Sequence, residues 1–172
     1  STNSATIFGL GAGGQNATPS ASTAYTTAVG TGALPALTTG TNAAALGFAA
    51  LDVATSSGSN TAIGLCALGG ANQNFCGGFT FPGTFGSYNT ALGNSAGFNL
   101  GSGSYNVALG DSAAFNQRNG SSNISIGEYA GGGNSSYSAN GTISIGDNAG
   151  TLLNNGADYN TLIGYHAGYN VG

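Results

Sequence analysis

The sequence predicts an all-β fold, a parallel β-solenoid (β-roll) of about nine coils with a 17-residue base period. Three observations predict it: a glycine that recurs along the chain, an alanine always three positions later, and a large apolar residue always directly before the glycine. A unit of this length is too short for a propeller blade or a helix pair, whereas it fits one coil whose strand pairs with its counterparts above and below. Residues 1–172 are therefore expected to form a single repeat domain.

The recurring glycine sets the period and is expected to permit a tight bend after each strand. It stands at Gly9, Gly30, Gly47, Gly64, Gly93, Gly110, Gly127, Gly146 and Gly164. Four of the eight intervals between these glycines are 17 residues long. The alanine three positions later is expected to pack where no larger side chain fits, at Ala12, Ala33, Ala50, Ala67, Ala96, Ala113, Ala130, Ala149 and Ala167.

The three residues before each glycine are expected to form a short strand whose side chains alternate between two faces. These strands are residues 6–8, 27–29, 44–46, 61–63, 90–92, 107–109, 124–126, 143–145 and 161–163. We predict that the last residue of each strand points inward, forming a core ladder at Leu92, Leu109, Ile126, Ile145 and Ile163. The middle residue, commonly Ala or Ser, would then face outward, where small side chains permit close lateral approach of another chain. The alternative is that this column packs within its own coil, against the return segment.

Stacked coils place equivalent residues in ladders. An asparagine four positions before the glycine is expected to bond to its counterparts up the stack, as Asn60, Asn89, Asn106, Asn123 and Asn160. The next column outward holds Tyr25, Tyr88, Tyr105 and Tyr159 and predicts an aromatic stripe.

A Gly- and Phe-rich insertion at about residues 69–86 interrupts the period. The chain has two cysteines, Cys66 at the base of the insertion and Cys76 within it. A Cys66–Cys76 disulfide is the simple interpretation, and it implies an oxidising compartment. Because the insertion alone breaks the repeat, Phe75, Phe79, Phe81 and Phe85 are expected to cover apolar surface or meet a partner.

Two motifs suggest catalysis or nucleotide binding, but both coincide with the repeat. GNSAG, Gly93 to Gly97, matches the nucleophile elbow of serine hydrolases. The equivalent position of its serine holds Gly, Ala, Cys, Tyr, Asn or His in other units, so we interpret GNSAG as a turn. GLGAGG, Gly9 to Gly14, matches the dinucleotide fingerprint but is followed by no helical pattern. We therefore expect no enzymatic activity and no cofactor.

The composition of the chain limits the kinds of partner that it is expected to bind. Charged residues make up 3% of the chain, and Arg118 is its single basic residue, which argues against nucleic acid. No apolar run approaches the roughly 20 residues of a membrane span, so no membrane insertion is expected.

Two surface features remain open. Asp111, Glu128 and Asp147 follow one another in the column after the glycine, where either water screens them or a cation lies between them. Sequons occur at Asn16, Asn119, Asn123, Asn134 and Asn140. If the organism glycosylates, Asn16, Asn119, Asn134 and Asn140 are the glycosylation candidates.

Units such as NTAIGLCAL, YNVALGDSA and YNTALGNSAG resemble the head repeats of trimeric autotransporter adhesins and the YNTAIG-type repeats of phage tail-fibre-like and bacterial surface proteins. The resemblance covers nearly the whole chain. It implies a left-handed parallel β-roll, usually trimeric, displayed outside the cell and binding host matrix or surfaces. The coils of this chain are longer than the typical adhesin head repeat, and it contains no charged heptad stalk and no membrane-anchor barrel.

The sequence favours an extracellular or cell-surface structural protein, a subunit of a self-assembling fibre or filament whose main partner is itself. The alternative is an adhesin head or tail-fibre segment that binds a surface receptor or matrix. Ice binding is a third hypothesis, although Thr26 and Thr27 form almost the only threonine pair within a strand. Head-to-tail stacking is expected because Ser1 of a second copy placed after Gly172 would separate Gly164 from the next Gly9 by 17 residues.

Overall fold

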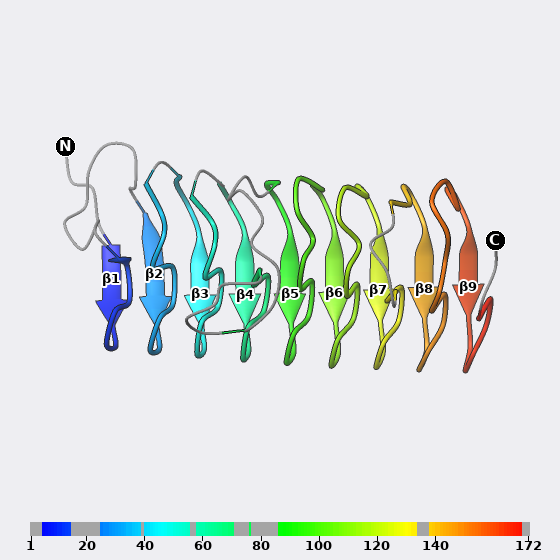
Figure 1. Ribbon diagram of the computed structural model, residues 1–172, viewed down its shortest axis with the longest axis horizontal. Helices are drawn as coiled ribbons and strands as arrows, with labels where there is room; N and C mark the ends of the chain where they lie inside the picture. The colour runs from blue at the N-terminus through cyan, green and yellow to red at the C-terminus, as the bar shows by residue number, and fades with distance from the viewer. Residues whose placement is uncertain are drawn as a thin grey trace.

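A computed structural model shows a parallel β-solenoid, and it describes residues 5–14, 25–38, 40–55, 58–70, 76, 86–133 and 138–169. Nine strands form one sheet in sequence order, each pairing in parallel with the next (Figure 1). Their bounds are β1 Ala5–Phe8, β2 Thr26–Val29, β3 Ala44–Leu46, β4 Thr61–Ile63, β5 Thr90–Leu92, β6 Val107–Leu109, β7 Ile124–Ile126, β8 Ile143–Ile145 and β9 Thr161–Ile163. The fold class and the strand positions predicted from the repeat are confirmed.

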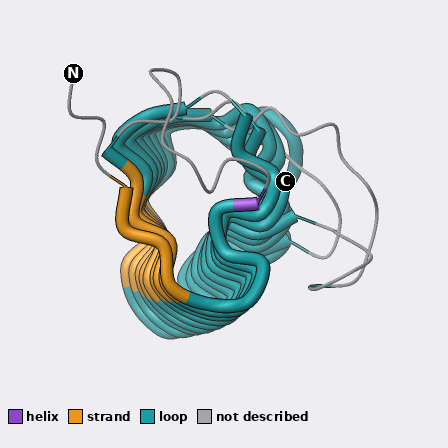
Figure 2. Tube along the Cα trace, turned by 90° about the vertical axis from the view of Figure 1, so that its left-hand side faces the viewer, coloured by secondary structure: helices purple, strands orange, loops and turns teal. Residues whose placement is uncertain are grey.

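The strand pairing has the register of the repeat. Leu46 pairs with Ile63, and Ile63 pairs with Leu92 across the insertion, so the residue before each glycine always meets its counterpart. Viewed along the rod, the strands stack into one wall of the coil, and turns form its remaining sides (Figure 2). Among the described residues, no helix is long and apolar enough to cross a membrane.

The anchor glycines stack on one another at the bend after each strand. From Gly30 to Gly164, each donates its N–H to the carbonyl of the residue before the preceding glycine, at 2.8–2.9 Å. These glycines have φ between 124° and 141°, which L side chains rarely adopt. A Cβ on any of the eight from Gly9 to Gly146 would also lie within 3.0 Å of the next glycine's carbonyl. The backbone path therefore requires glycine here for two independent reasons.

Other corners of the coil repeat a left-handed backbone on residues with side chains. Positive φ recurs five positions before the glycine, as at Tyr88 and Tyr105, and two positions after it, as at Ser95 and Ser112. Among the described residues, none of the non-glycine residues with positive φ is Val, Ile or Thr. β-Branched side chains are the most strained in this conformation, which accounts for their absence from these positions.

The interior of the coil is lined by the middle residue of each strand, and the predicted core ladder is wrong. Ala28, Ala45, Ala62, Ala91, Ala108, Ser125 and Ser144 are buried, each 2% exposed or less. In contrast, Leu92 is 48% exposed and Ile163 65% exposed. Leu109, Ile126 and Ile145 are only half-buried. The alternation was identified correctly, but the two faces were assigned in reverse.

The narrow interior explains the reversal. The middle residue of the strand faces the position four residues after the glycine. In the β1 to β4 and β9 coils one of the two is large and the other small, whereas in the β5 to β8 coils both are small, as at Ala91 and Gly97. Large residues of the strand face glycine: a Cβ on Gly13 would lie 2.7 Å from Cδ1 of Ile7, and one on Gly168 would lie 2.6 Å from Cδ2 of Leu162. In the coils that carry Ala28, Ala45 and Ala62, the same position holds the buried Leu34, Leu51 and Leu68. The invariant alanines from Ala12 to Ala149 fill the rest of the core as predicted, and Ala167 is half-buried.

A matched pair of substitutions in β6 tests this assignment. Ala108→Asp places an unpaired charge in the core and is expected to lower the free energy of unfolding by more than about 4 kcal/mol. Leu109→Asp, one residue away on the outward face, is expected to cost about 1 kcal/mol or less. Urea denaturation of both variants measures the difference. Equal destabilisation would show that the two faces are assigned incorrectly.

Candidate interaction surface

The asparagine ladder predicted from the sequence is present and buried. Asn60, Asn89, Asn106 and Asn123 are each 2% exposed or less. Asn106 Nδ2 donates to Asn89 Oδ1 at 3.1 Å, and Asn123 Nδ2 donates to Asn106 Oδ1 at 3.0 Å. Each Nδ2 also donates to a main-chain carbonyl, as from Asn106 to Gly120 at 2.9 Å. The ladder therefore bonds the residue directly before each of these strands to the neighbouring coil.

Thr142 occupies the ladder position in the β8 coil and separates Asn160 from the other members. Its N–H donates to Asn123 Oδ1 at 2.8 Å, and its hydroxyl donates to the Ala157 carbonyl at 2.9 Å. Asn160 Nδ2 donates to the same carbonyl at 3.0 Å. Threonine thus reproduces the bond to the main chain but not the amide-to-amide bonds.

Replacing Asn106 measures what the ladder contributes. Asn106→Ala removes the acceptor of the main-chain and side-chain N–H groups of Asn123 and the donor to the Gly120 carbonyl. We expect a loss of at least about 3 kcal/mol of unfolding free energy. Asn106→Thr, which copies position 142, is expected to lose about half as much. Chemical denaturation compares the two, and an Asn106→Ala variant as stable as the parent would contradict the ladder's role.

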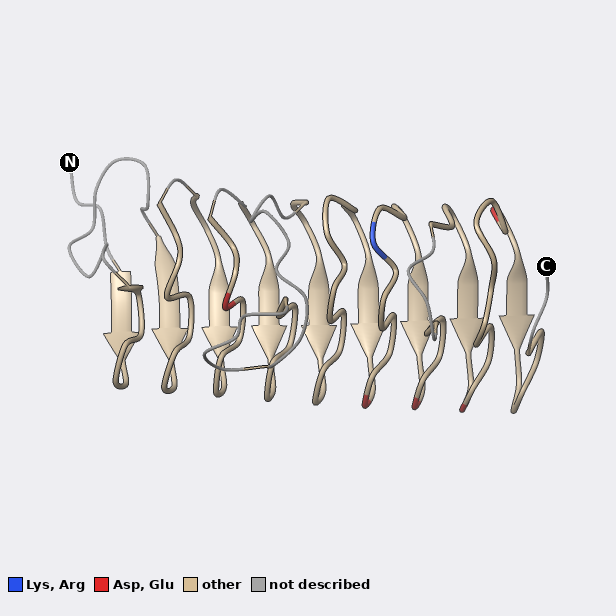
Figure 3. Ribbon diagram, viewed as in Figure 1, with Lys and Arg blue, Asp and Glu red and all other residues tan. Residues whose placement is uncertain are grey.

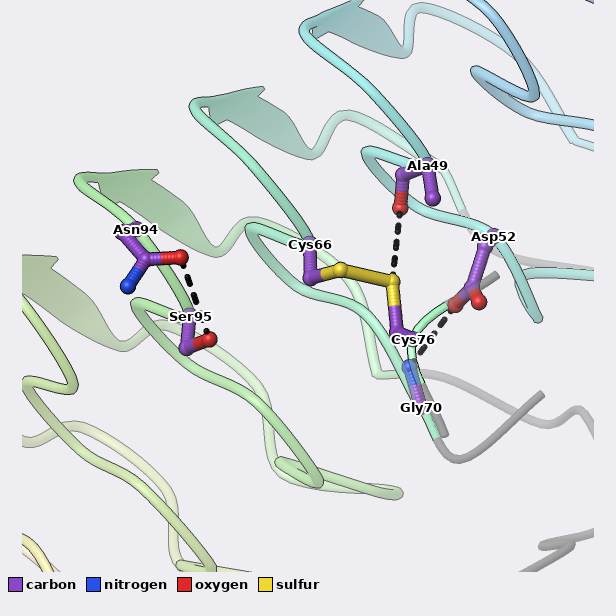
Figure 4. The surroundings of a disulfide bond; sticks show 7 residues. All are labelled: Ala49, Asp52, Cys66, Gly70, Cys76, Asn94 and Ser95. Atoms are coloured by element: carbon purple, nitrogen blue, oxygen red, sulfur yellow. Dashed lines mark hydrogen bonds between the residues drawn. A yellow bond between two sulfur atoms is a disulfide. The ribbon is translucent and has the colours of Figure 1, made fainter. Parts of the chain in front are cut away.

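A disulfide joins Cys66 and Cys76 as predicted, with their Cα atoms 6.0 Å apart. It attaches the start of the insertion to the turn of the β4 coil, next to Ala49 and Asp52 of the preceding coil (Figure 4). Cys66 stands two positions after its glycine, where φ is 52°. Phe75, Phe79, Phe81 and Phe85 lie outside the described residues.

Asp52 is a buried carboxyl near this disulfide, and no repeated pattern in the sequence points to it. Its side chain is fully buried, and Oδ1 accepts the N–H of Gly70 at 2.9 Å while Oδ2 has no hydrogen-bond partner. Burial raises the pKa of Asp52 from 3.8 to about 6, although backbone N–H groups act in the opposite direction. The core therefore favours the protonated form.

This carboxyl makes stability depend on pH. Because its pKa is raised in the folded state, its contribution to stability is fully present below pH 3.8 and is lost as pH rises through 6. We expect this group to lower the unfolding free energy by up to about 3 kcal/mol between pH 4 and pH 7.

Asp52→Asn should remove this part of the pH dependence and stabilise the protein at pH 7. Glu128→Gln, the same kind of change at an exposed carboxyl, is the control and should preserve it. Thermal unfolding across this range measures both. A slope unchanged in Asp52→Asn would assign the dependence to another group.

The outward face of the sheet carries an apolar column. This main column, directly before the glycines, includes Phe8 75% exposed, Leu46 49%, Ile63 38%, Leu92 48% and Ile163 65%. The parallel column two residues earlier is mixed. It holds Val107, Ile124 and Ile143 in three strands and threonine in five others, Thr6, Thr27, Thr61, Thr90 and Thr161. None of the nine strands contains a charged residue. We refer to these two columns as the outer sheet face.

The small middle residues of the strands were expected to face outward and to permit lateral approach of another chain. That expectation is wrong, because the members of this column from Ala28 to Ser144 line the interior.

The tyrosine stripe is present in part. Tyr25, Tyr88, Tyr105 and Tyr159 are all exposed, and the rings of Tyr88 and Tyr105 stack with centroids 4.9 Å apart.

The acidic column lies at the bend of the β6, β7 and β8 coils, where Figure 3 shows Asp111, Glu128 and Asp147 at the coil ends. Amides lie beside two of them: Asn94 Nδ2 donates to Asp111 Oδ1, and Asn148 Nδ2 donates to Asp147 Oδ1. Among the described residues, no group of three or more His, Cys, Asp or Glu side chains is placed to hold a metal ion.

The glycosylation candidates differ in accessibility. Asn119 is exposed, and its Oδ1 accepts the hydroxyl of Ser102. Asn140 is half-buried and its amide donates to Asp158. The sequon at Asn123 is not accessible, because this side chain is buried in the ladder. Asn16 and Asn134 lie outside the described residues.

The two enzyme-like motifs are turns. Gly93–Gly97 follows β5 as a turn in which Ser95 has φ of 52°, and its hydroxyl donates to Asn94 Oδ1 at 3.5 Å. Gly9–Gly14 is the equivalent turn after β1, and a Cβ on Gly13 would meet Ile7.

Comparison with known proteins gives no match: no family model, curated protein or solved structure matches this chain.

Proposed function

We propose that this protein is an extracellular structural protein, a subunit of a self-assembling fibre or surface filament whose β-solenoids associate through the outer sheet face. The observation that carries the proposal is the apolar main column of this face. A sheet with one face in water normally alternates apolar residues inside with polar residues outside. Here the large apolar residues are outside and the small ones inside.

The size of the outer sheet face fits an interaction surface. Nine strands of about three residues, spaced at ~4.8 Å and rising ~3.3 Å per residue, give a footprint on the order of 400 Å². Patches of about this size on a monomer mark interaction sites. Leu10, Phe48 and Leu65, which are 83%, 41% and 48% exposed, extend the apolar surface beyond the bend at the β1, β3 and β4 coils.

A second copy of the chain is the partner that suits this face. Its ridges repeat at every strand, so a surface with the same spacing contacts it along the whole length, as in stacked-sheet interfaces. The absence of charge from the nine strands removes like-charge repulsion between copies.

End-on stacking is the second mode of assembly in this proposal. β1 and β9 are the outermost strands of the sheet, and in the described residues each pairs with one neighbour. An unpaired strand edge is a template for another chain unless it is covered. Lateral and end-on contacts together would build a fibre from rods.

An extracellular or cell-surface location is supported by the Cys66–Cys76 disulfide, because such bonds persist in oxidising compartments. The proposed role needs no catalysis and no cofactor. The alternative, an adhesin head or tail-fibre segment that binds a surface receptor, has its support in a pocket on another wall of the coil, described in the next section.

Charges on the outer sheet face test lateral assembly. The double variant Leu109→Lys/Ile126→Lys is expected to stay folded and to lose side-by-side association, which shifts the protein to monomers and single end-on rods in sedimentation velocity. Ser102→Lys/Asn119→Lys adds the same charge at exposed positions of neighbouring coils and is expected to assemble like the parent. Electron microscopy of the three proteins distinguishes filaments from discrete particles.

Circular dichroism verifies that both double variants keep the fold. A parent protein that is monomeric at high concentration, or a Leu109→Lys/Ile126→Lys variant that assembles as well as the control, would refute assembly through this face.

A further inference from the structure

Two aromatic rings stack on the wall of the coil that follows the glycine bend, and the stack ends before the next coil. Five positions after the glycine, Phe98 and Phe115 stack with centroids 5.4 Å apart and planes within 10°. The next two coils carry Gly132 and Thr151 at this position. The outer face of the Phe115 ring therefore has no aromatic partner from the β7 coil.

The backbone continues in register through the interruption. The N–H of Asn116 donates to the Phe98 carbonyl at 2.9 Å, and the N–H of Gly133 donates to the Phe115 carbonyl at 2.9 Å. Gly132 thus occupies the level at which a third ring would stack. The gap results from the missing side chain and not from a displacement of the coil.

A pocket of about 270 Å³ lies at this gap, lined by Ser112, Phe115, Asn116, Tyr129, Gly133 and Thr151. These residues come from the coils of β6, β7 and β8, so the pocket is one coil deep along the rod. Cavities of about 150 Å³ hold a benzene ring, and this volume admits one ring with substituents. Residues 134–137 lie outside the described residues.

The side chains that line the pocket determine which kind of ring-shaped ligand fits it. Phe115 provides an apolar face, while Ser112, Asn116, Tyr129 and Thr151 provide hydroxyl and amide groups. Asn116 is held in place, since its Oδ1 accepts from Asn99 Nδ2 at 2.8 Å and its Nδ2 donates to the Gly133 carbonyl at 3.1 Å. None of the described lining residues is charged. A neutral ring with one C–H face and polar substituents matches this combination.

We propose that the gap above Phe115 is a binding site for a neutral pyranose sugar, which stacks on Phe115 in the place of the missing third ring. The hydroxyls of the sugar meet the polar rim formed by Ser112, Tyr129 and Thr151. The site lies outside the outer sheet face, so sugar binding and lateral assembly are separate properties. It gives the chain a means of attaching to glycan-coated surfaces.

Ligand-observed NMR with a panel of methyl hexopyranosides and N-acetylhexosaminides tests the site. At least one sugar is expected to bind saturably to the parent protein. Gly132→Phe continues the aromatic stack and fills the gap, and it should abolish binding. A Cβ on Gly132 would lie 3.0 Å from the Tyr129 carbonyl, so thermal unfolding must confirm that this variant is folded.

Phe115→Leu removes the stacking face without adding bulk and provides an independent variant. It should weaken sugar binding about tenfold, in line with the loss of one aromatic contact. Phe98→Leu shortens the same stack on the side away from the pocket and is the matched control, expected to bind like the parent.

The Leu109→Lys/Ile126→Lys variant should bind sugar normally, which separates this proposal from lateral assembly. The proposal is overturned if no sugar in the panel binds, or if Phe115→Leu and Phe98→Leu bind sugar equally well. It is also overturned if only an aromatic probe such as phenol binds in the pocket. That last result would assign the gap to an aromatic side chain of a protein partner.

Discussion

The close stacking of the coils at their glycine bends is the constraint on which the rest of the molecule depends. At each bend the next backbone lies where a Cβ would be, and the glycine N–H is bonded to the coil before it. Such close stacking, with a short strand and several left-handed corners in every coil, leaves a narrow interior. Alanine, serine and a few leucines fill it. The larger side chains of the strands then have only one direction left, which is outward.

Periodicity made the coil path, the strand register and the asparagine ladder predictable, because each of them repeats at a fixed position. It could not predict which face of the strand is buried. Alternation separates Ala108 from Leu109 but does not say which one points inward, and the usual preference of large apolar residues for the core favours the wrong answer. The size compensation between Ile7 and Gly13, and between Leu162 and Gly168, was a usable signal in the sequence. It relates positions six residues apart across the coil, which a search for strand alternation does not compare.

Features that occur once were beyond the same reasoning. Asp52 has no acidic counterpart in its column, and only the structure shows that it is buried under the disulfide. The disulfide itself was predictable because the chain has two cysteines that can pair with each other. The pocket beside Phe115 depends on what Gly132 lacks, and a missing side chain becomes visible only when neighbouring coils are stacked in register.

The two proposed binding surfaces use the repeat in opposite ways. The outer sheet face is regular over nine strands, so its contacts multiply with length and suit a partner that has the same period. The gap at Gly132 is a single departure from the repeat, so it offers one site of defined depth, bounded by Phe115 on one side and Thr151 on the other. A solenoid can lose a side chain at one coil without losing its backbone ladder, because the hydrogen bonds between coils are made by the main chain. The same ladder that makes the rod regular thereby allows a specific site to be placed on it with no change to the outer sheet face.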